Sequence, residues 1–429
     1  MTVTRFERLF QSQARLIMGS NWRRMFAMIA LLPIWALSFL VPRRKDLWVL
    51  GTWDGLTYTD NTRHLHAWIS ANRKPGIRAV WITRNLELAE ELRDLGGDAA
   101  SLYSVRGIWL CLRAGTYIFT HTVDDICLWL SGRAFRVNLW HGVPLKKINF
   151  DNRFDRYRNA RGLKRLANWP HRLKRLVKPH RIVVSSDSQV PVFSGAFRID
   201  PERVLPLGYP RNDRLVDPGF PSLLLSIESR WLDRLHGLKA QGRRIVLYMP
   251  TFRRNENPGQ YQKALNADEL DQHLSQLDAH LLIKAHPMST DFTSFEQNGH
   301  DRIDCMPTGM DPYLILALAD ILLTDYSSIF YDYLLLDRPI IFYPFDIEHY
   351  QKMERELYFD YDRYVPGPVV GTPQEMLDQI QRALRLEDGY QARRKELLTE
   401  IFDTNGGNSC GRIVSDIVAT IGAEPTARV

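Results

Sequence analysis

The feature that most restricts the fold of this chain is an alternation of short apolar, β-prone runs with longer helical runs, which begins after Pro42. In the first half these runs predict strands at Asp46–Leu50, Arg78–Thr83, Thr116–Thr120, Arg136–Trp140, Arg181–Ser185 and Arg203–Leu207. The second half repeats the pattern at Arg244–Met249, His280–Ile283, Ile321–Leu323 and Pro339–Tyr343. Strands that alternate with helices form βαβ units with parallel strands. The sequence therefore predicts the α/β class.

The chain is too long for one ordinary hydrophobic core, because it has 429 residues, and two domains are expected. A turn-rich stretch at 207–213 separates the two halves. We expect one Rossmann-like domain over residues 45–215 and another over 216–429, each with a parallel sheet, facing each other across a cleft.

Residues 1–44 form a separate basic and hydrophobic segment. Within it, residues 25–41 carry no charge, are flanked by arginines and contain Pro33. As a helix this stretch would be about 26 Å long, just short of the roughly 30 Å hydrocarbon core of a bilayer. An interfacial or re-entrant anchor, a true span and a docked core helix are all consistent with this pattern. A span would carry several arginines across the membrane, so we favour a segment that lies on it.

A second stretch, residues 146–181, holds thirteen Lys or Arg and only two Asp, although the whole chain has a net charge of +7. Leucines at helical spacing interleave with the basic residues, which is typical of a helix on an anionic bilayer. A nucleic-acid surface or a solvated basic face would look similar in charge; we expect a membrane and no nucleic acid. The residues assigned to the acceptor or membrane side are Lys146, Lys147, Arg165, Lys174 and Arg175.

Several classes of enzyme are disfavoured by missing patterns. The chain has no glycine-rich dinucleotide fingerprint after its first strand, no phosphate-binding P-loop and no nucleophile elbow. Its four cysteines are scattered and form no metal-binding spacing. The cysteine pattern therefore argues against a zinc site.

Three motifs stand where predicted strands end, at 140–146, 284–287 and 324–328. Ligands of open α/β sheets bind outside the carboxyl ends of the strands. His141 and His286 could transfer a proton or contact a phosphate there. The serines at 327 and 328 open a helix, whose first N–H groups attract phosphate. Structural histidines and a simple helix cap are the alternatives, but together the motifs indicate a phosphate-ester site.

Other polar residues at the same strand ends complete the predicted site. Arg211 lies in the turn between the halves, where it could also pair with Asp213 to fix that turn. The residues that we assign to the donor phosphates or nucleotide are Ser327, Ser328, Asp325, Thr251, Arg253 and Arg211.

As a set, these motifs resemble the CDP-glycerol glycerophosphotransferase family, which includes primases and polymerases of teichoic acid and related capsular polymers. The resemblance runs in order over about residues 45–375, through 139–146, 208–213, 283–287 and 325–328. It implies a GT-B fold with an N-terminal acceptor domain and a C-terminal nucleotide domain, and a reaction that uses neither a metal nor a cofactor. It also implies that His141 and His286 match the two important histidines of the family, and that the double serine matches its donor-phosphate turn.

The resemblance further implies transfer of glycerol phosphate, or a related polyol phosphate, from a CDP-activated donor. The acceptor would be a hydroxyl of a lipid-linked glycan or polyol phosphate at the cytoplasmic face of the membrane, and CMP would be released. His141 is the candidate base, although the two histidines could exchange roles. Val143 and Phe252 depart from the residues usual in the family, which leaves the particular donor and acceptor open. Whether the protein forms a homo-oligomer is also open.

Two other functions remain open from the sequence. One is a GT-B glycosyltransferase that uses a nucleotide sugar for capsule or lipopolysaccharide synthesis. The other is a non-catalytic, membrane-associated assembly protein. Retention of both histidines and of the double serine argues against the second.

Overall fold

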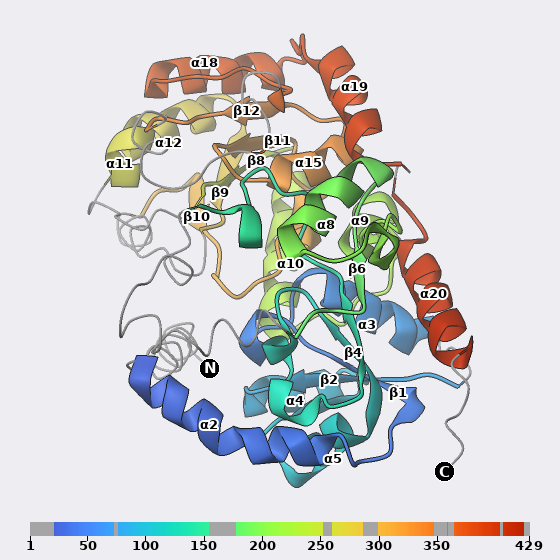
Figure 1. The fold of residues 1–429 in the computed structure, drawn as a ribbon. Helices are drawn as coiled ribbons and strands as arrows, with labels where there is room; N and C mark the ends of the chain where they lie inside the picture. The colour runs from blue at the N-terminus through green and yellow to red at the C-terminus, as the bar shows by residue number, and fades with distance from the viewer. Residues whose placement is uncertain are drawn as a thin grey trace.

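The computed structural model describes residues 21–72, 76–153, 177–251, 260–285, 299–346, 358, 364–403 and 406–423. It contains a seven-stranded sheet in the order β3-β2-β1-β4-β5-β6-β7 and a five-stranded sheet in the order β10-β9-β8-β11-β12, both parallel throughout (Figure 1). The predicted α/β fold with parallel sheets is confirmed.

The first sheet consists of β1 (Arg44–Leu50), β2 (Arg78–Thr83), β3 (Ala99–Ser101), β4 (Ala114–Phe119), β5 (Phe135–Asn138), β6 (Arg181–Val183) and β7 (Val204–Leu205). The second consists of β8 (Arg244–Met249), β9 (Ala279–Ile283), β10 (Ile303–Cys305), β11 (Ile321–Thr324) and β12 (Ile340–Phe342). All ten predicted strands are present. The inner strands are buried on both faces, which explains their continuous apolar sequences.

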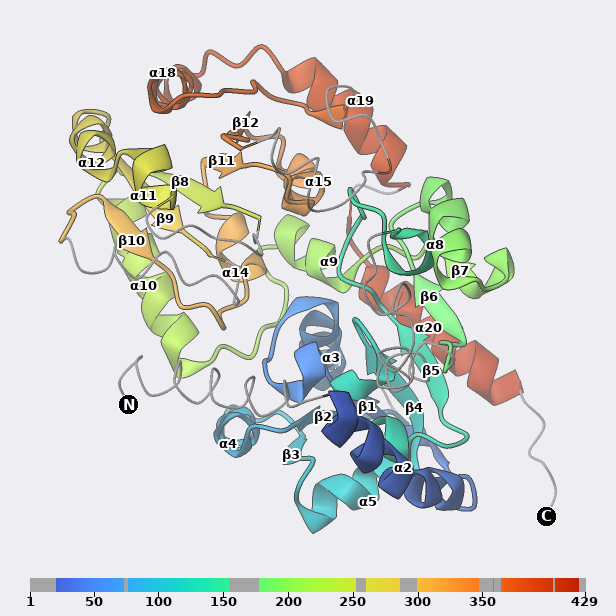
Figure 2. The same cartoon turned by 60° about the vertical axis from the view of Figure 1, so that its left-hand side comes forward.

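Helices cover both sheets (Figure 2). They are α2 (Asn21–Ser38), α3 (Asp60–Asn72), α4 (Leu86–Asp94), α5 (Val105–Arg113), α8 (Val190–Phe197), α9 (Pro210–Val216), α10 (Ser226–Ala240), α11 (Gln260–Leu265), α12 (Ala267–Gln276), α14 (Tyr313–Leu316), α15 (Ile329–Tyr333), α18 (Pro373–Leu384), α19 (Gln391–Ile401) and α20 (Ser409–Ala423). Local sequence sets several of their starts. Asn85 and Ser104 accept backbone N–H bonds at the starts of α4 and α5, and Thr372 forms a capping box with Glu375 at α18.

Strand order reverses once in each sheet, between β1 and β4 and between β8 and β11. In an open parallel sheet, the crevice at such a reversal, outside the carboxyl ends of the strands, is where ligands bind. His141 lies three residues after the end of β5, and Asp325 directly follows β11, so both are close to these two reversals. The fold therefore places the predicted motifs at the edges where a site is expected.

The N-terminal apolar segment is helical over most of its length, as α2, and packs against the 3-10 turn Leu128–Leu130 of the first domain. Met28 is buried, and the Ser38 hydroxyl accepts a bond from the Gly132 N–H at 3.0 Å. Among the described helices, none combines the length and the apolar character needed to cross a membrane.

The last helix, α20, lies within the range predicted for the second domain but runs back along the first (Figures 1 and 2). Asp213 of α9 accepts the backbone N–H groups of Ser409 and Cys410 at 3.0 and 2.9 Å, and thereby caps the start of α20. Farther along the helix, Asp416 approaches Arg181 of β6 at 3.8 Å. The end of the chain thus fastens the two halves together.

Candidate active site

The turn that carries His141 is held by two neighbouring helices. Trp140 has a left-handed backbone, with φ 51°, and Gly142 has φ 118°. The side-chain amide of Asn61, on α3, donates to the carbonyls of Leu139 at 3.2 Å and Trp140 at 2.8 Å. A side chain at 142 would displace Arg211, because a Cβ there would lie 2.0 Å from the Arg211 guanidinium.

The His141 ring lies in a group of aromatic side chains. It stacks on Trp140 at 4.0 Å between ring centroids, and on His121 at 4.2 Å with the two planes 15° apart. His121 follows β4, the strand beside β5, and sequence reasoning missed it. Its position directly after a predicted strand was the available signal, since the same argument selected His141.

On the second domain, Asp325 braces the turns that follow β8 and β11. Its carboxylate is fully buried and accepts the Thr251 N–H at 2.9 and 3.1 Å. Ser327 and Ser328 come next and are both partly exposed. Ser328 begins α15 without a side-chain capping bond, so the simple cap expected as the alternative is not observed for its hydroxyl. These two serines are the more accessible part of the motif.

Arg211 is buried between the two domains. Its Nη1 donates to the His141 carbonyl at 2.8 Å and to Asp60 at 3.1 Å, and its Nη2 donates to Asp332 of α15 at 2.6 Å. Burial alone would lower the pKa of Arg211, but the carboxylates of Asp332 and Asp60 raise it well above its ordinary value. The predicted pair with Asp213 is wrong, because Asp213 caps α20 instead.

Arg211 is also one of the residues predicted to contact the donor phosphates. Its side chain is about 5 % exposed, and it contacts two carboxylates and one carbonyl. One guanidinium thus joins the His141 turn of the first domain to the helix that follows the double serine of the second. The two strand-end edges therefore face each other across a shared, buried arginine.

A second buried cluster reinforces the contact between domains. Asp311, from the second half, accepts the Asp60 N–H at 3.0 Å and lies 3.3 Å from His64. Burial would raise the pKa of Asp311, but His64 and Arg63 more than offset this and hold it well below its ordinary value. Arg63 also donates to Glu228 of α10 at 2.7 Å. Two buried carboxylates of the second half therefore hold helix α3 in place.

The basic loop after His141 also touches the second half. Tyr358 donates its N–H to the Leu145 carbonyl at 2.9 Å and its hydroxyl to Asp151 at 2.7 Å. Lys146 and Lys147, predicted for the acceptor side, are partly exposed on this loop. The predicted site residues that lie outside the described residues are His286, Arg253, Arg165, Lys174 and Arg175.

Lys284, which precedes His286, is described and buried at the end of β9. Its Nζ donates to the Thr308 carbonyl at 2.8 Å, and burial lowers its pKa to about 8, against an opposing effect of Asp311. Lys284 is therefore engaged within the protein. Over the described parts of the chain, no group of three or more His, Cys, Asp or Glu side chains could hold a metal ion.

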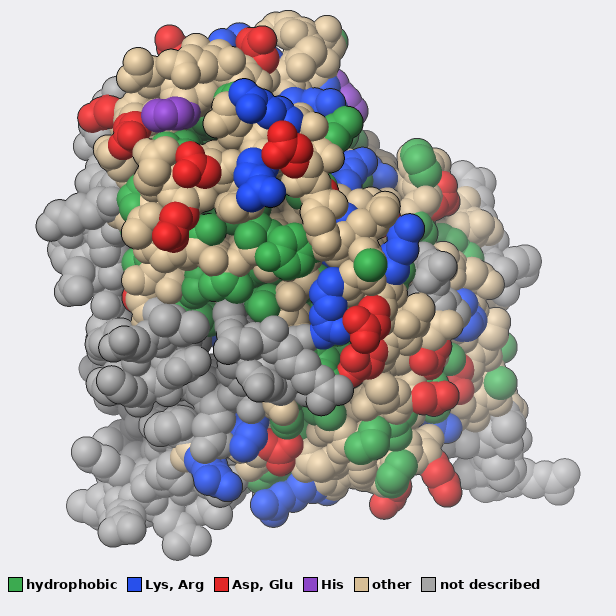
Figure 3. Space-filling view, turned by 90° about the horizontal axis from the view of Figure 1, so that it is seen from above, with side chains coloured by type: hydrophobic (Ala, Val, Ile, Leu, Met, Phe, Trp, Pro, Cys, Tyr) green, Lys and Arg blue, Asp and Glu red, His purple; other side chains and the backbone are tan. Residues whose placement is uncertain are grey.

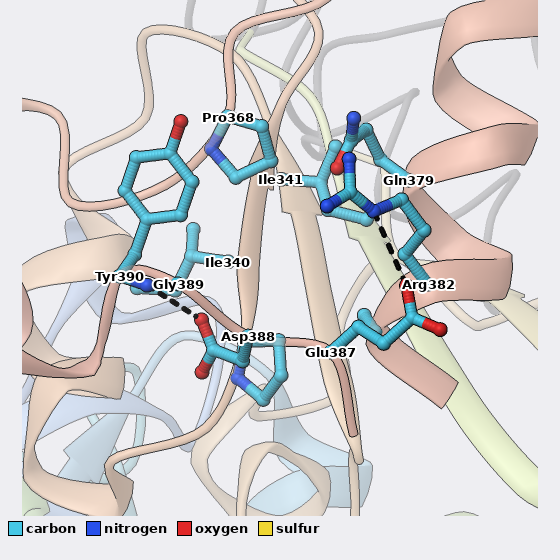
Figure 4. Close-up of a pocket in the computed structure, with 11 residues that line it drawn as sticks. Ile340, Ile341, Pro368, Gln379, Arg382, Glu387, Asp388, Gly389 and Tyr390 are labelled. Atoms are coloured by element: carbon cyan, nitrogen blue, oxygen red, sulfur yellow. Dashed lines mark hydrogen bonds and ion pairs between the residues drawn. The ribbon is translucent and has the colours of Figure 1, made fainter. Parts of the chain in front are cut away.

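One pocket of about 180 Å³ lies elsewhere, between β12 and the turn after α18 (Figure 4). It is smaller than the roughly 300 Å³ at which small-molecule sites begin. Its lining includes Pro339 and Ile340 at the start of β12, the end opposite to the double serine. Asp388, which also lines it, is bound by Arg394. This pocket is not the candidate site.

Comparison with known proteins agrees with this geometry. A family described as CDP-glycerol:poly(glycerophosphate) glycerophosphotransferase matches residues 34–419. A teichoic acid poly(glycerol phosphate) polymerase of Bacillus spizizenii is 26% identical over 407 residues, covering 88% of this chain and 93% of that protein. A polymerase of the same description from Staphylococcus epidermidis is 24% identical over 385 residues, covering 86% of this chain but 50% of that protein.

Two further comparisons concern a transferase and a solved structure. A teichoic acid glycerol-phosphate transferase of Staphylococcus aureus is 25% identical over 389 residues, covering 87% of this chain and 93% of that protein. The structure of the wall teichoic acid polymerase TagF superposes with a TM-score of 0.73 at 20% identity, covering 98% of this chain and 99% of that one. Since the family match extends over nearly the whole chain, the protein belongs to the CDP-glycerol:poly(glycerophosphate) glycerophosphotransferase family.

Proposed function

We propose that this protein transfers glycerol phosphate from CDP-glycerol to a hydroxyl of a membrane-linked glycan or polyol-phosphate acceptor, in the synthesis of a cell-surface polymer such as teichoic acid. The family match and the relatives of similar length support this activity. The observation that carries it is the Arg211 bridge, because it brings the His141 turn and the helix after the double serine to one buried group.

In the proposed reaction, the acceptor oxygen forms a bond to the β-phosphorus of the donor. The bond from that phosphorus to the bridging oxygen breaks, and CMP leaves with that oxygen. His141 accepts the proton of the acceptor hydroxyl. It can reach a substrate because it is partly exposed beyond the carboxyl end of β5. Such chemistry depends on positioning and on stabilising the phosphate charges.

The donor would bind on the other side of the crevice. Ser327 and Ser328 are partly exposed at the start of α15, where backbone N–H groups can donate to phosphate oxygens. Thr251 lies on the neighbouring turn, held there by Asp325. We assign the remaining donor contacts to His286 and Arg253. In this assignment residues 45–215 bind the acceptor and residues 216–429 bind the nucleotide.

A screen of activated donors tests the activity. Purified protein is incubated with CDP-glycerol, CDP-ribitol, and UDP- or GDP-sugars, together with a lipid-linked acceptor, and the released nucleotide is measured. We expect CMP release that depends on the acceptor. Turnover with a nucleotide sugar alone would instead identify a glycosyltransferase, and no turnover of any donor would favour a non-catalytic role.

We also propose that the protein binds the cytoplasmic face of the membrane as a peripheral protein. Helices α2 and α5 lie side by side at one end of the first domain (Figures 1 and 2). Arg43 ties them together, since it donates to the carbonyls of Ser38 and Cys111 at 3.2 and 2.8 Å. Large apolar side chains remain exposed on α2, on α5 and just after α2, among them Leu37, Leu40, Val105 and Trp109 at 61, 76, 86 and 59 %.

The charge of this surface suits an anionic bilayer. Neither helix contains an Asp or Glu residue, and Arg113 stacks over Trp109 at 5.7 Å. By contrast, acidic and basic side chains are interspersed on the described face of the second domain (Figure 3). The basic stretch at 146–181 would add further attraction to anionic lipid.

Vesicle sedimentation tests the membrane proposal. Leu40→Glu combined with Val105→Glu should release the protein from vesicles that contain anionic lipid, because each change places a carboxylate in the apolar surface. Leu386→Glu is the matched control, since Leu386 is 80 % exposed at the end of α18, in the second domain. Equal binding of the double variant and the control would show that this surface does not bind the membrane.

A further inference from the structure

A second imidazole lies against the proposed catalytic histidine. The rings of His121 and His141 stack at 4.2 Å, and the Trp53 ring lies 4.4 Å from that of His121. These side chains follow β4, β5 and β1, which are neighbours in the first sheet, and the order of strands reverses between β1 and β4. His121 therefore occupies the crevice position where a ligand is expected.

His121 is fixed in place by polar contacts on several sides. Its Nδ1 lies 3.0 Å from the Thr120 hydroxyl and 3.7 Å from the buried carboxylate of Asp125. The same carboxylate accepts the backbone N–H of His121 at 2.8 Å, and the Asn138 amide donates to its carbonyl at 3.3 Å. A ring held in this way keeps its orientation toward His141.

The charges around His121 favour its protonated form. Burial alone would lower the pKa of His121, but Asp125, Asp60 and Asp54, from three different elements, raise it. Two nearby arginines are already bound to other groups. Arg211 is bound to Asp60 and Asp332, and Arg84 donates to the backbone carbonyls of Asp124 and Ile126.

We propose that His121 is a positioning residue for the transfer reaction: it holds a positive charge against the ring of His141 and so keeps His141 in its neutral, proton-accepting form. Two adjacent like charges disfavour each other, so protonation of His121 opposes protonation of the ring stacked on it. This proposal rests on the role of His141 in the proposed function. It also explains why an imidazole, and not simply an aromatic ring, adjoins the base.

The direct test is a titration of the histidines by NMR in the full-length protein, with no substrate present. We expect His121 to take up its proton at a higher pH than His141. In His121→Phe, which keeps a flat ring but removes the charge, the protonation midpoint of His141 should rise by about one pH unit. A His141 that titrates above His121 in the native protein, or a midpoint that does not move, would overturn the proposal.

The pH profile of CMP release gives a second readout. The acid limb of kcat/KM should move up by about one pH unit in His121→Phe, and His121→Asn serves if that variant does not fold. Trp53→Phe is the control, because it alters the same ring group without changing charge, and its acid limb should stay at the native pH. A uniform loss of rate at every pH would show a purely structural role. If the native protein released no CMP, the proposed function would fail while the NMR titration would still decide on His121.

Discussion

Arg211 shows how one residue can set the geometry of a site between two domains. Its guanidinium contacts the backbone carbonyl of His141, the proposed base, and carboxylates on α3 and α15. A planar, permanently charged fork can satisfy three acceptors in fixed directions, which a lysine cannot. The histidine turn and the helix of the donor side therefore move together.

Replacing Arg211 should weaken both stability and catalysis. Arg211→Met leaves Asp60 and Asp332 buried without their cation, and removing one partner of a buried pair costs about 3–5 kcal/mol. Arg211→Lys keeps the charge and should cost less, while still losing transfer activity because it cannot make all three contacts. Urea unfolding and CMP release measure the two effects. Native activity in Arg211→Lys would contradict the positioning role.

Gly142 provides a sharper test of the same contact. Gly142→Ala should lower transfer activity and destabilise the protein by about 1–3 kcal/mol, because the residue has φ 118° and its new Cβ would clash with Arg211. Gly237→Ala is the control, since it lies in α10 with nothing near its Cβ position, and should be neutral or stabilising. Similar effects of both changes would argue against the steric account.

Among elements, the sequence predicted the strands well because their signal is local. The two that it missed, β3 and β10, are edge strands of three residues each, too short to show alternation. Helix α3 lies in one of the stretches between strands that were expected to be helical, but its bounds were not predicted. It is rich in polar residues such as Arg63 and His64, yet it is buried, because its partners come from distant parts of the chain. A helix face that packs against charged side chains leaves no periodic pattern of apolar residues in the sequence.

Two histidines should make the fold sensitive to acid. Burial lowers the pKa of His66, on α3, to about 4, and burial with nearby arginines does the same for His180. As pH falls from about 6.5 to 4, these histidines become protonated in the unfolded chain but stay neutral in the folded protein, so the free energy of unfolding decreases. At pH 5 the free energy of unfolding is lower by about 2 kcal/mol because of His66 alone.

Urea unfolding at pH 7 and pH 5 measures this effect. The midpoint should fall more for the native protein than for His66→Gln, whose side chain does not titrate. A variant that loses as much stability as the native protein between these pH values would show that His66 is not responsible.

At the scale of the molecule, buried charges join the two domains through α3. Arg63 binds Glu228 of α10 and lies 4.0 Å from Asp311 of the second half, with all three side chains at most 1 % exposed. Such a clamp limits independent motion of the domains. The predicted positions of His141, Thr251 and Ser328 followed from strand ends, whereas this clamp and the Arg211 bridge join residues that are 70 or more positions apart in the sequence.

Arg63→Met should therefore uncouple the halves. We expect a single cooperative unfolding transition for the native protein and two separated transitions for the variant, followed by calorimetry. The physical reason is that the two carboxylates lose their shared cation in a dry interface. Arg234→Met is the control, because the Arg234 side chain is 54 % exposed in its pair with Asp304, and ion pairs near the surface contribute little. One transition at an unchanged temperature in Arg63→Met would contradict the clamp.

The most direct test of the account is acceptor-dependent CMP release from CDP-glycerol by the native protein and by His141→Ala, measured side by side with folding checked by circular dichroism. We predict clear release by the native protein and a loss of about a hundredfold or more in the variant, because general-base catalysis contributes roughly that much. Near-native release from folded His141→Ala would contradict it.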